Sequence, residues 1–145
     1  MAKQYEMNGF RRAANAFVSW LARRGRGPAF ELVTIGRRSH EPRTVPVTPV
    51  EVDGDRYLVS PYGDVGWVHN IRASGTATLR RGGQAESITV TEVGPEEAGR
   101  VLAVYHAQVG KIVHPYFDVP AVPTVEDFVA EAAAHPVFRI EQVVT

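Results

Sequence analysis

Two glycine-containing turns constrain the fold of this chain more than any other feature of its sequence. Asp53-Gly54 precedes a strand-like segment at 56–60, and Gly82-Gly83 separates segments at 76–81 and 84–93. Such dipeptides suit the two-residue turns of β-hairpins, where the central residues take positive φ angles. Strands joined by hairpins are antiparallel, so the sequence predicts an antiparallel sheet.

Three further strands are expected, at 30–35, at 44–52 and at 137–143. The alternation of valines in 44–52 changes phase at Thr48-Pro49, which predicts a bulge or bend there. The total is six strands with no visible protection for a free sheet edge, which favours a closed barrel. No strand is followed by a G-x-G-x-x-G turn, which argues against a dinucleotide-binding doubly wound fold.

Helices are expected between and beside these strands. One spans 64–74 and ends at Gly75, and another begins at Pro95 and runs into a loop at 110–123. Thr124 and Asp127 resemble a capping box that opens a third helix. The predicted class is mainly β (α+β), with flanking helices around a six-stranded antiparallel barrel in a single domain, 1–145.

An amphipathic helix is expected within residues 1–26, where four apolar residues recur at helical spacing: Phe10, Ala14, Phe17 and Leu21. Arginines lie among and after them. The favoured interpretation is that this helix packs on the barrel. The alternative is a weak contact with an anionic membrane surface.

Composition excludes several classes of function. Lys+Arg and Asp+Glu both number 16, so the net charge is zero, which argues against non-specific binding of nucleic acid. The chain has no cysteine, and its five histidines show no metal-ligand spacing, so no metal site is expected. No apolar run approaches the roughly 20 residues of a membrane helix. Residues 1–12 lack a signal-peptide core, so we expect a cytoplasmic protein.

The loop at 36–43 carries Arg37, Arg38 and Arg43. Guanidinium groups match phosphate and carboxylate oxygens in a bidentate way, so this loop is a candidate anion site; a solvated turn is the alternative. Ser60-Pro61-Tyr62-Gly63 lies between a strand and a helix, where free backbone N–H groups can hold a phosphate. On that helix, Trp67 suits a core anchor, whereas Asn70 on the same face needs polar partners.

These segments together show a family resemblance. The runs 36–39 (GRRS), 42–47 (PRTVPV), 60–63 (SPYG) and 67–72 (WVHNIR) resemble the deazaflavin (coenzyme F-420)-dependent nitroreductase family, which is similar to flavin-binding split β-barrels. The resemblance implies a split β-barrel that transfers a hydride from reduced coenzyme F-420. The acceptors it implies are quinones, nitro compounds or activated enones.

The resemblance also implies which residues contact the coenzyme. The arginines would meet its anionic tail, the backbone of 44–47 would line its ring, and 60–63 would hold phosphate, backed by Trp67 and Asn70. The expected cofactor-binding residues are Arg37, Arg38, Ser39, Arg43, Thr44, Val45, Pro46, Val47, Ser60, Pro61, Tyr62, Gly63, Trp67 and Asn70.

Tyr105 and Tyr116 are candidate proton donors, because the resemblance places their segment over the ring and a phenol can donate without carrying charge. Two alternatives remain open. One is an FMN-dependent reductase or oxidase on the same fold, and the other is a non-catalytic binder of haem, fatty acid or the coenzyme. The expected partner is a small-molecule acceptor, and the chain is expected to be a monomer or homodimer.

Overall fold

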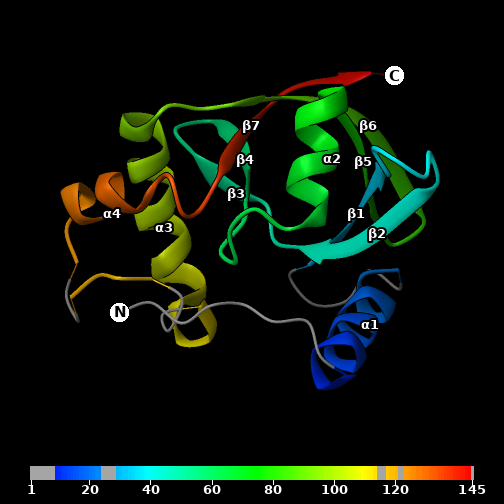
Figure 1. Cartoon of the computed structure of the whole chain (residues 1–145), viewed down its shortest axis with the longest axis horizontal. Helices are drawn as coiled ribbons and strands as arrows, with labels where there is room; N and C mark the ends of the chain where they lie inside the picture. The colour runs from blue at the N-terminus through cyan, green and yellow to red at the C-terminus, as the bar shows by residue number, and fades with distance from the viewer. Residues whose placement is uncertain (1–8, 24–28, 114–116, 121–122, 145) are drawn as a thin grey trace.

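A computed structural model describes residues 9–23, 29–113, 117–120 and 123–144 of the chain. Seven strands and four helices follow one another in this part (Figure 1). Their bounds are α1 Gly9–Arg23, β1 Phe30–Ile35, β2 Pro42–Val47, β3 Val50–Val52, β4 Asp55–Val59, α2 Gly66–Ser74, β5 Thr76–Arg81, β6 Gln84–Glu92, α3 Pro95–Val113, α4 Val125–Glu131 and β7 Val137–Val144.

The described strands form one antiparallel sheet in the order β2-β1-β5-β6-β7-β4-β3. The architecture is mainly β with helices, as expected, and is consistent with a split-barrel-like α+β fold. Two details of the prediction are wrong. The described part of the chain has seven strands rather than six, and their sheet is open, with β2 at one edge and β3 at the other.

Both differences have one cause, which is the break at Thr48-Pro49. The sequence predicted a single bent strand at 44–52, but β2 pairs with β1 while β3 pairs with β4 at the opposite edge. The chain therefore crosses between the two sheet edges at this point. Proline cannot donate to a strand ladder, so pairing ends where Pro49 stands.

The turn and cap signals give the expected local structure. Asp53 and Gly54 have φ values of 53° and 86°, and Gly82 and Gly83 have 57° and 80°, which are the positive values that tight hairpins require. Gly75 ends α2 in the left-handed region with φ 72°. The capping box of α4 is present, with Thr124 and Asp127 in reciprocal hydrogen bonds. By contrast, α3 extends to Val113, three residues beyond the predicted start of the loop at Gly110.

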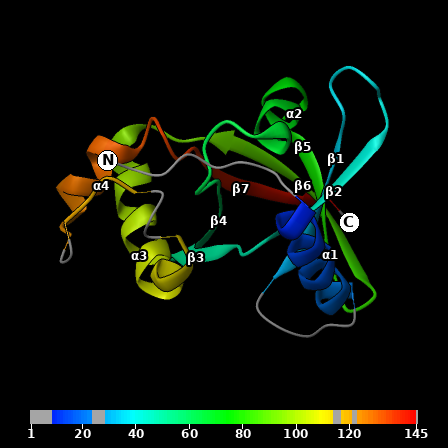
Figure 2. The same ribbon diagram turned by 60° about the horizontal axis from the view of Figure 1, so that its bottom comes forward.

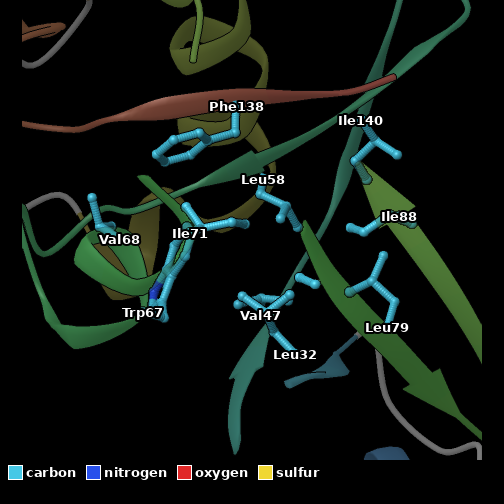
Figure 3. Packing of buried hydrophobic residues seen from close by; sticks show 11 residues of the cluster. Leu32, Val47, Leu58, Trp67, Val68, Ile71, Leu79, Ile88, Phe138 and Ile140 are labelled. Atoms are coloured by element: carbon cyan, nitrogen blue, oxygen red, sulfur yellow. The ribbon is translucent and has the colours of Figure 1, made fainter. Parts of the chain in front are cut away.

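Two apolar cores hold the fold together. The first lies between α2 and strands that include β1, β5, β6 and β7, and Figure 3 shows its side chains converging, with Leu32, Leu58 and Val68 fully buried. The second lies between α3, α4 and the strands β3 and β4, with Phe128 and Leu102 at its centre. The two cores place α2 near one end of the sheet and α3 and α4 at the other (Figure 1).

Helix α1 packs against β1, β2 and β5, which agrees with the favoured interpretation of the N-terminal helix. Figure 2 shows it alongside the β1–β2 end of the molecule, away from α4. Its Phe17 and Trp20 rings stack on one another and remain 59% and 43% exposed. None of the helices in the described part of the chain combines the length and apolar character needed to cross a membrane.

Candidate functional site

A cleft of about 310 Å³ opens where α1, β2, α2 and α3 approach one another. Its size falls at the lower end of the range for small-molecule pockets. Apolar side chains supply most of its wall, and its lining residues are Asn15, Val18, Ala29, Val45, Pro46, Val47, Thr48, Val59, Pro61, Tyr62, Val65, Gly66, Trp67, Tyr105 and Val109. The cleft therefore brings together six of the predicted cofactor-binding residues and one predicted proton donor.

One wall of the cleft is β2, which is an edge strand. Pro42 and Pro46 lack N–H groups, and prolines are tolerated in edge strands where the missing donor faces away from the ladder. Thr44 lies between them in the same phase, so its N–H also points outward. This edge accordingly offers a row of carbonyl acceptors and one amide donor to a neighbouring planar group.

A second wall is the loop Ser60–Gly63, called the 60–63 loop below. Pro61 and Tyr62 line the cleft, whereas Ser60 is completely buried behind them. The Ser60 hydroxyl donates to the Gly63 carbonyl, and Gly63 takes a φ of 87°, which favours glycine. The loop is therefore a tight internal turn whose front faces the cleft.

The N-terminus of α2 opens on the same cleft, because Val65, Gly66 and Trp67 line it. Val65 occupies the N-cap position and provides no side-chain hydrogen bond, and the first turn contains no acidic residue. The first N–H groups of a helix need acceptors and carry partial positive charge. This helix end is thus suited to an anionic or carbonyl oxygen in the cleft.

The arginine loop (residues 36–43) lies outside the cleft lining but is tied to α2. Asn70 is buried, with 4% exposed, and its Oδ1 accepts from the Arg37 backbone N–H at 3.1 Å and from Arg37 Nη1 at 3.3 Å. Its Nδ2 donates to the Thr34 hydroxyl at 3.1 Å. The W-x-x-N motif therefore links the arginine loop to the helix that borders the cleft.

The arginine side chains of this loop face solvent. Arg37, Arg38 and Arg43 are exposed, and within the described ranges no carboxylate forms an ion pair with any of them. The loop is closed by the Gly36 N–H donating to the Glu41 carbonyl at 2.8 Å. The Ser39 hydroxyl accepts from the Glu41 N–H, so its oxygen is already used within the turn. The turn holds Arg37 and Arg38, and Arg43 follows in β2, so three cations that no described carboxylate pairs lie close together in the sequence.

Tyr105 projects from α3 into the cleft and is 6% exposed. Burial, together with the nearby Tyr62 phenol, raises the pKa of the Tyr105 hydroxyl well above its usual range. The phenol is therefore protonated at neutral pH and able to donate. Tyr116, the second predicted donor, lies outside the described residues.

Trp67 serves both the core and the cleft. Its ring is 7% exposed and packs against Phe138 with ring centroids 5.8 Å apart, while it also lines the cleft. The indole therefore fixes the start of α2 on the sheet. Thr44, Ser60, Gly63 and Asn70 border the site without lining the cleft.

The sequence patterns marked neither eight of the residues that line the cleft nor His135 behind it. Asn15 and Val18 of α1 complete one side of the cleft, and His135 contacts the back of the 60–63 loop. The apolar spacing in α1 assigned Ala14 and Phe17 to the packed face, which is wrong, because both are exposed while Asn15 and Val18 line the cleft. The spacing of the histidines bears only on metal binding, so it gives no sign that His135 contacts this loop.

Comparison with known proteins gives the decisive observation. The family model described as "F420H(2)-dependent quinone reductase" matches residues 8–122, which is more than three quarters of the chain. The chain belongs to this family. Its cofactor is coenzyme F-420, and the protein is an oxidoreductase. No curated protein matches the chain.

Solved structures agree on the fold. An F420-H2-dependent reductase is 21% identical, with 79% of this chain and 94% of that chain covered and a TM-score of 0.55. A structure described as a domain-swapped dimer is 21% identical, with 79% and 80% covered and a TM-score of 0.56. A NimC/NimA family protein from Clostridium acetobutylicum is 17% identical, with 94% and 85% covered and a TM-score of 0.52. At these identities the likeness concerns the fold.

Proposed function

We propose that this protein binds reduced coenzyme F-420 in the cleft beside β2 and uses it to reduce small organic acceptors, namely quinones, nitro compounds or activated enones. The observation that carries the proposal is the cleft itself, an apolar slot that joins an edge strand, an uncapped helix N-terminus and a buried phenol. When bound, the reduced coenzyme supplies the hydride. The chain must bind it, orient it and exclude water.

The residues of the cleft fit a planar, polar-edged ring. Val45, Val47 and Trp67 offer apolar contact surface, and the outward edge of β2 offers carbonyls together with the Thr44 N–H. A flat heterocycle with alternating donors and acceptors along one edge can pair with such a strand in the manner of an added strand. We infer that the β2 edge orients the ring and that the 60–63 loop and α2 close its other side.

The arginine loop fits the anionic tail. F-420 carries a phosphate and glutamates, and Arg37, Arg38 and Arg43 provide three guanidinium groups that no described carboxylate neutralises. Charge-assisted contacts of this kind are about twice as strong as neutral hydrogen bonds. FMN has one phosphate, so the loop favours the deazaflavin coenzyme over FMN.

Tyr105 is the proposed proton donor to the reduced acceptor. Its raised pKa keeps the proton on the phenol until an acceptor oxygen develops negative charge beside it. Tyr116 remains a second candidate that lies outside the described residues.

We also infer a single-domain cytoplasmic enzyme, monomeric or homodimeric, that contacts a membrane surface weakly through α1. The exposed Phe17–Trp20 pair supports the surface contact, because aromatic side chains suit the membrane–water interface. Co-sedimentation with anionic and neutral lipid vesicles tests it. Binding that is equal for wild type and for Phe17→Ser would contradict it.

Parallel titration of the protein with oxidised F-420 and with FMN, followed by fluorescence, tests the proposed cofactor site. We expect tighter binding of F-420 and a fall in its affinity with added salt, because exposed charge pairs are screened. Arg38→Ala should weaken F-420 binding by about 1.5–3 kcal/mol and leave the free energy of unfolding almost unchanged. Equal binding of FMN would support the alternative flavoenzyme.

A further inference from the structure

The 60–63 loop is held from behind by the segment that joins α4 to β7. The Ser60 N–H donates to the Pro136 carbonyl at 2.9 Å, and the Pro61 carbonyl lies 2.8 Å from Nδ1 of His135. A Cβ added at Gly63 would lie 3.5 Å from the Ala134 carbonyl, so the two segments are in contact along their length. The front of the same loop forms the cleft wall.

His135 is buried, with 3% exposed, and its ring is fixed on three sides. Nδ1 faces the Pro61 carbonyl, Nε2 lies 3.3 Å from the Glu131 carboxylate, and one ring face stacks on Phe117 with centroids 3.9 Å apart. A carbonyl oxygen can only accept, so Nδ1 must carry the proton in this contact. The tautomer is thereby set by the 60–63 loop.

Glu131 extends the contact to a second part of the site. Its carboxylate also accepts from the Asp118 backbone N–H at 2.6 Å. Asp118 and Phe117 follow α3, the helix that carries Tyr105 into the cleft. His135 and Glu131 therefore connect the 60–63 loop to the segment that follows α3.

We propose that His135 is a positioning residue that holds Pro61 and Tyr62 in the shape needed to bind the coenzyme. The residue touches neither the cleft nor a ligand, so it acts through the Pro61 carbonyl. The inference rests on the proposed function, because it assumes that the coenzyme occupies this cleft. An imidazole held by the Nδ1–H hydrogen bond to the Pro61 carbonyl and by the stacked Phe117 ring leaves the loop one arrangement, which lowers the conformational cost of binding.

Two substitutions at His135 separate the hydrogen bond from mere packing. His135→Asn keeps a side-chain N–H near the position of Nδ1, and His135→Gln moves the amide toward Glu131. We expect His135→Gln to weaken coenzyme binding about tenfold, the effect of one lost hydrogen bond, and His135→Asn to stay within about threefold of wild type. Ile88→Val, in the other core, serves as the control for general destabilisation and should bind as wild type does.

Hydrogen exchange of the coenzyme-free protein gives a readout independent of the ligand. The Tyr62 and Gly63 amides should exchange faster in His135→Gln than in wild type or His135→Asn, while amides of β5 stay unchanged. Equal affinity and equal exchange in both His135 variants and wild type would overturn the inference, and so would equal losses in both variants. If wild type fails to bind F-420 while the exchange pattern holds, the proposed function fails and the positioning of the loop stands.

Discussion

Asn70→Ala should reduce both the stability of the fold and the affinity for the coenzyme. The substitution removes the hydrogen bond to the buried Thr34 hydroxyl and the two bonds to Arg37. A buried polar group left without a partner costs about 1–3 kcal/mol. Thr34 is 1% exposed, whereas the bond from the Arg37 amide is only partly buried, so we expect a loss of about 2–4 kcal/mol in the free energy of unfolding.

The affinity should fall for a separate reason. Without Asn70, the arginine loop loses its only described attachment to α2 through a side chain, so Arg37 is no longer held in place for the anionic tail. We expect the Kd for F-420 to rise about three- to tenfold, the effect of roughly 0.7–1.4 kcal/mol. Urea unfolding followed by tryptophan fluorescence and titration with F-420 measure the two effects on the same samples.

Thr34→Val is the matched control. It removes the hydroxyl that accepts from Asn70 and leaves both contacts between Asn70 and Arg37 in place. It should cost about 1–3 kcal/mol in stability, because the buried Asn70 Nδ2 loses this acceptor, and leave the Kd within about twofold of wild type. If Asn70→Ala lowers stability but binds F-420 as wild type does, Asn70 is purely structural and the reasoning about the arginine loop is refuted.

Three further predictions concern other parts of the molecule. Tyr105→Phe should slow turnover by about 10²–10⁴-fold with unchanged coenzyme affinity, and a change of only a few-fold in steady-state assays would make water the donor. Gly99→Ala should lower the midpoint of thermal unfolding, because the new Cβ would lie 2.9 Å from the Val129 backbone nitrogen. Such overpacking costs about 1–3 kcal/mol, which outweighs the roughly 1 kcal/mol by which alanine stabilises a helix relative to glycine. Burial lowers the pKa of His135, so near the ordinary histidine pKa of about 6.5 the unfolded chain takes up a proton that the folded chain does not. The free energy of unfolding should therefore be highest above that pH and fall as the pH drops below it. The same decline in His135→Asn would show that His135 is not its cause.

Local features of the fold were predictable, and long-range ones were not. The turns at Asp53-Gly54 and Gly82-Gly83 and the cap at Thr124 follow from the backbone preferences of those residues alone. The assignment of 42–47 and 50–52 to opposite sheet edges depends on partners far away in the sequence. A change of phase at Thr48-Pro49 signals a break but does not say where the second half pairs.

In the candidate site, too, the sequence indicated individual residues but not the contacts between residues far apart in the chain. Residue types pointed to the arginine loop and to Tyr105, but the contact between Arg37 and Asn70 joins residues 33 positions apart and appears only in the fold. His135 is 74 positions from Pro61, and no motif marks it. The hydrogen-bonding needs of a buried amide correctly predicted that Asn70 must have partners, though not which ones.

The most direct test of the account is anaerobic turnover of reduced F-420 by the purified protein with menadione as acceptor. We expect the coenzyme to be oxidised in proportion to the quinone reduced, the rate to depend on protein concentration, and reduced FMN in place of F-420 to support little reaction. Tight binding of reduced F-420 with no consumption in the presence of menadione, a simple nitroaromatic or an activated enone would contradict it and make the protein a coenzyme carrier.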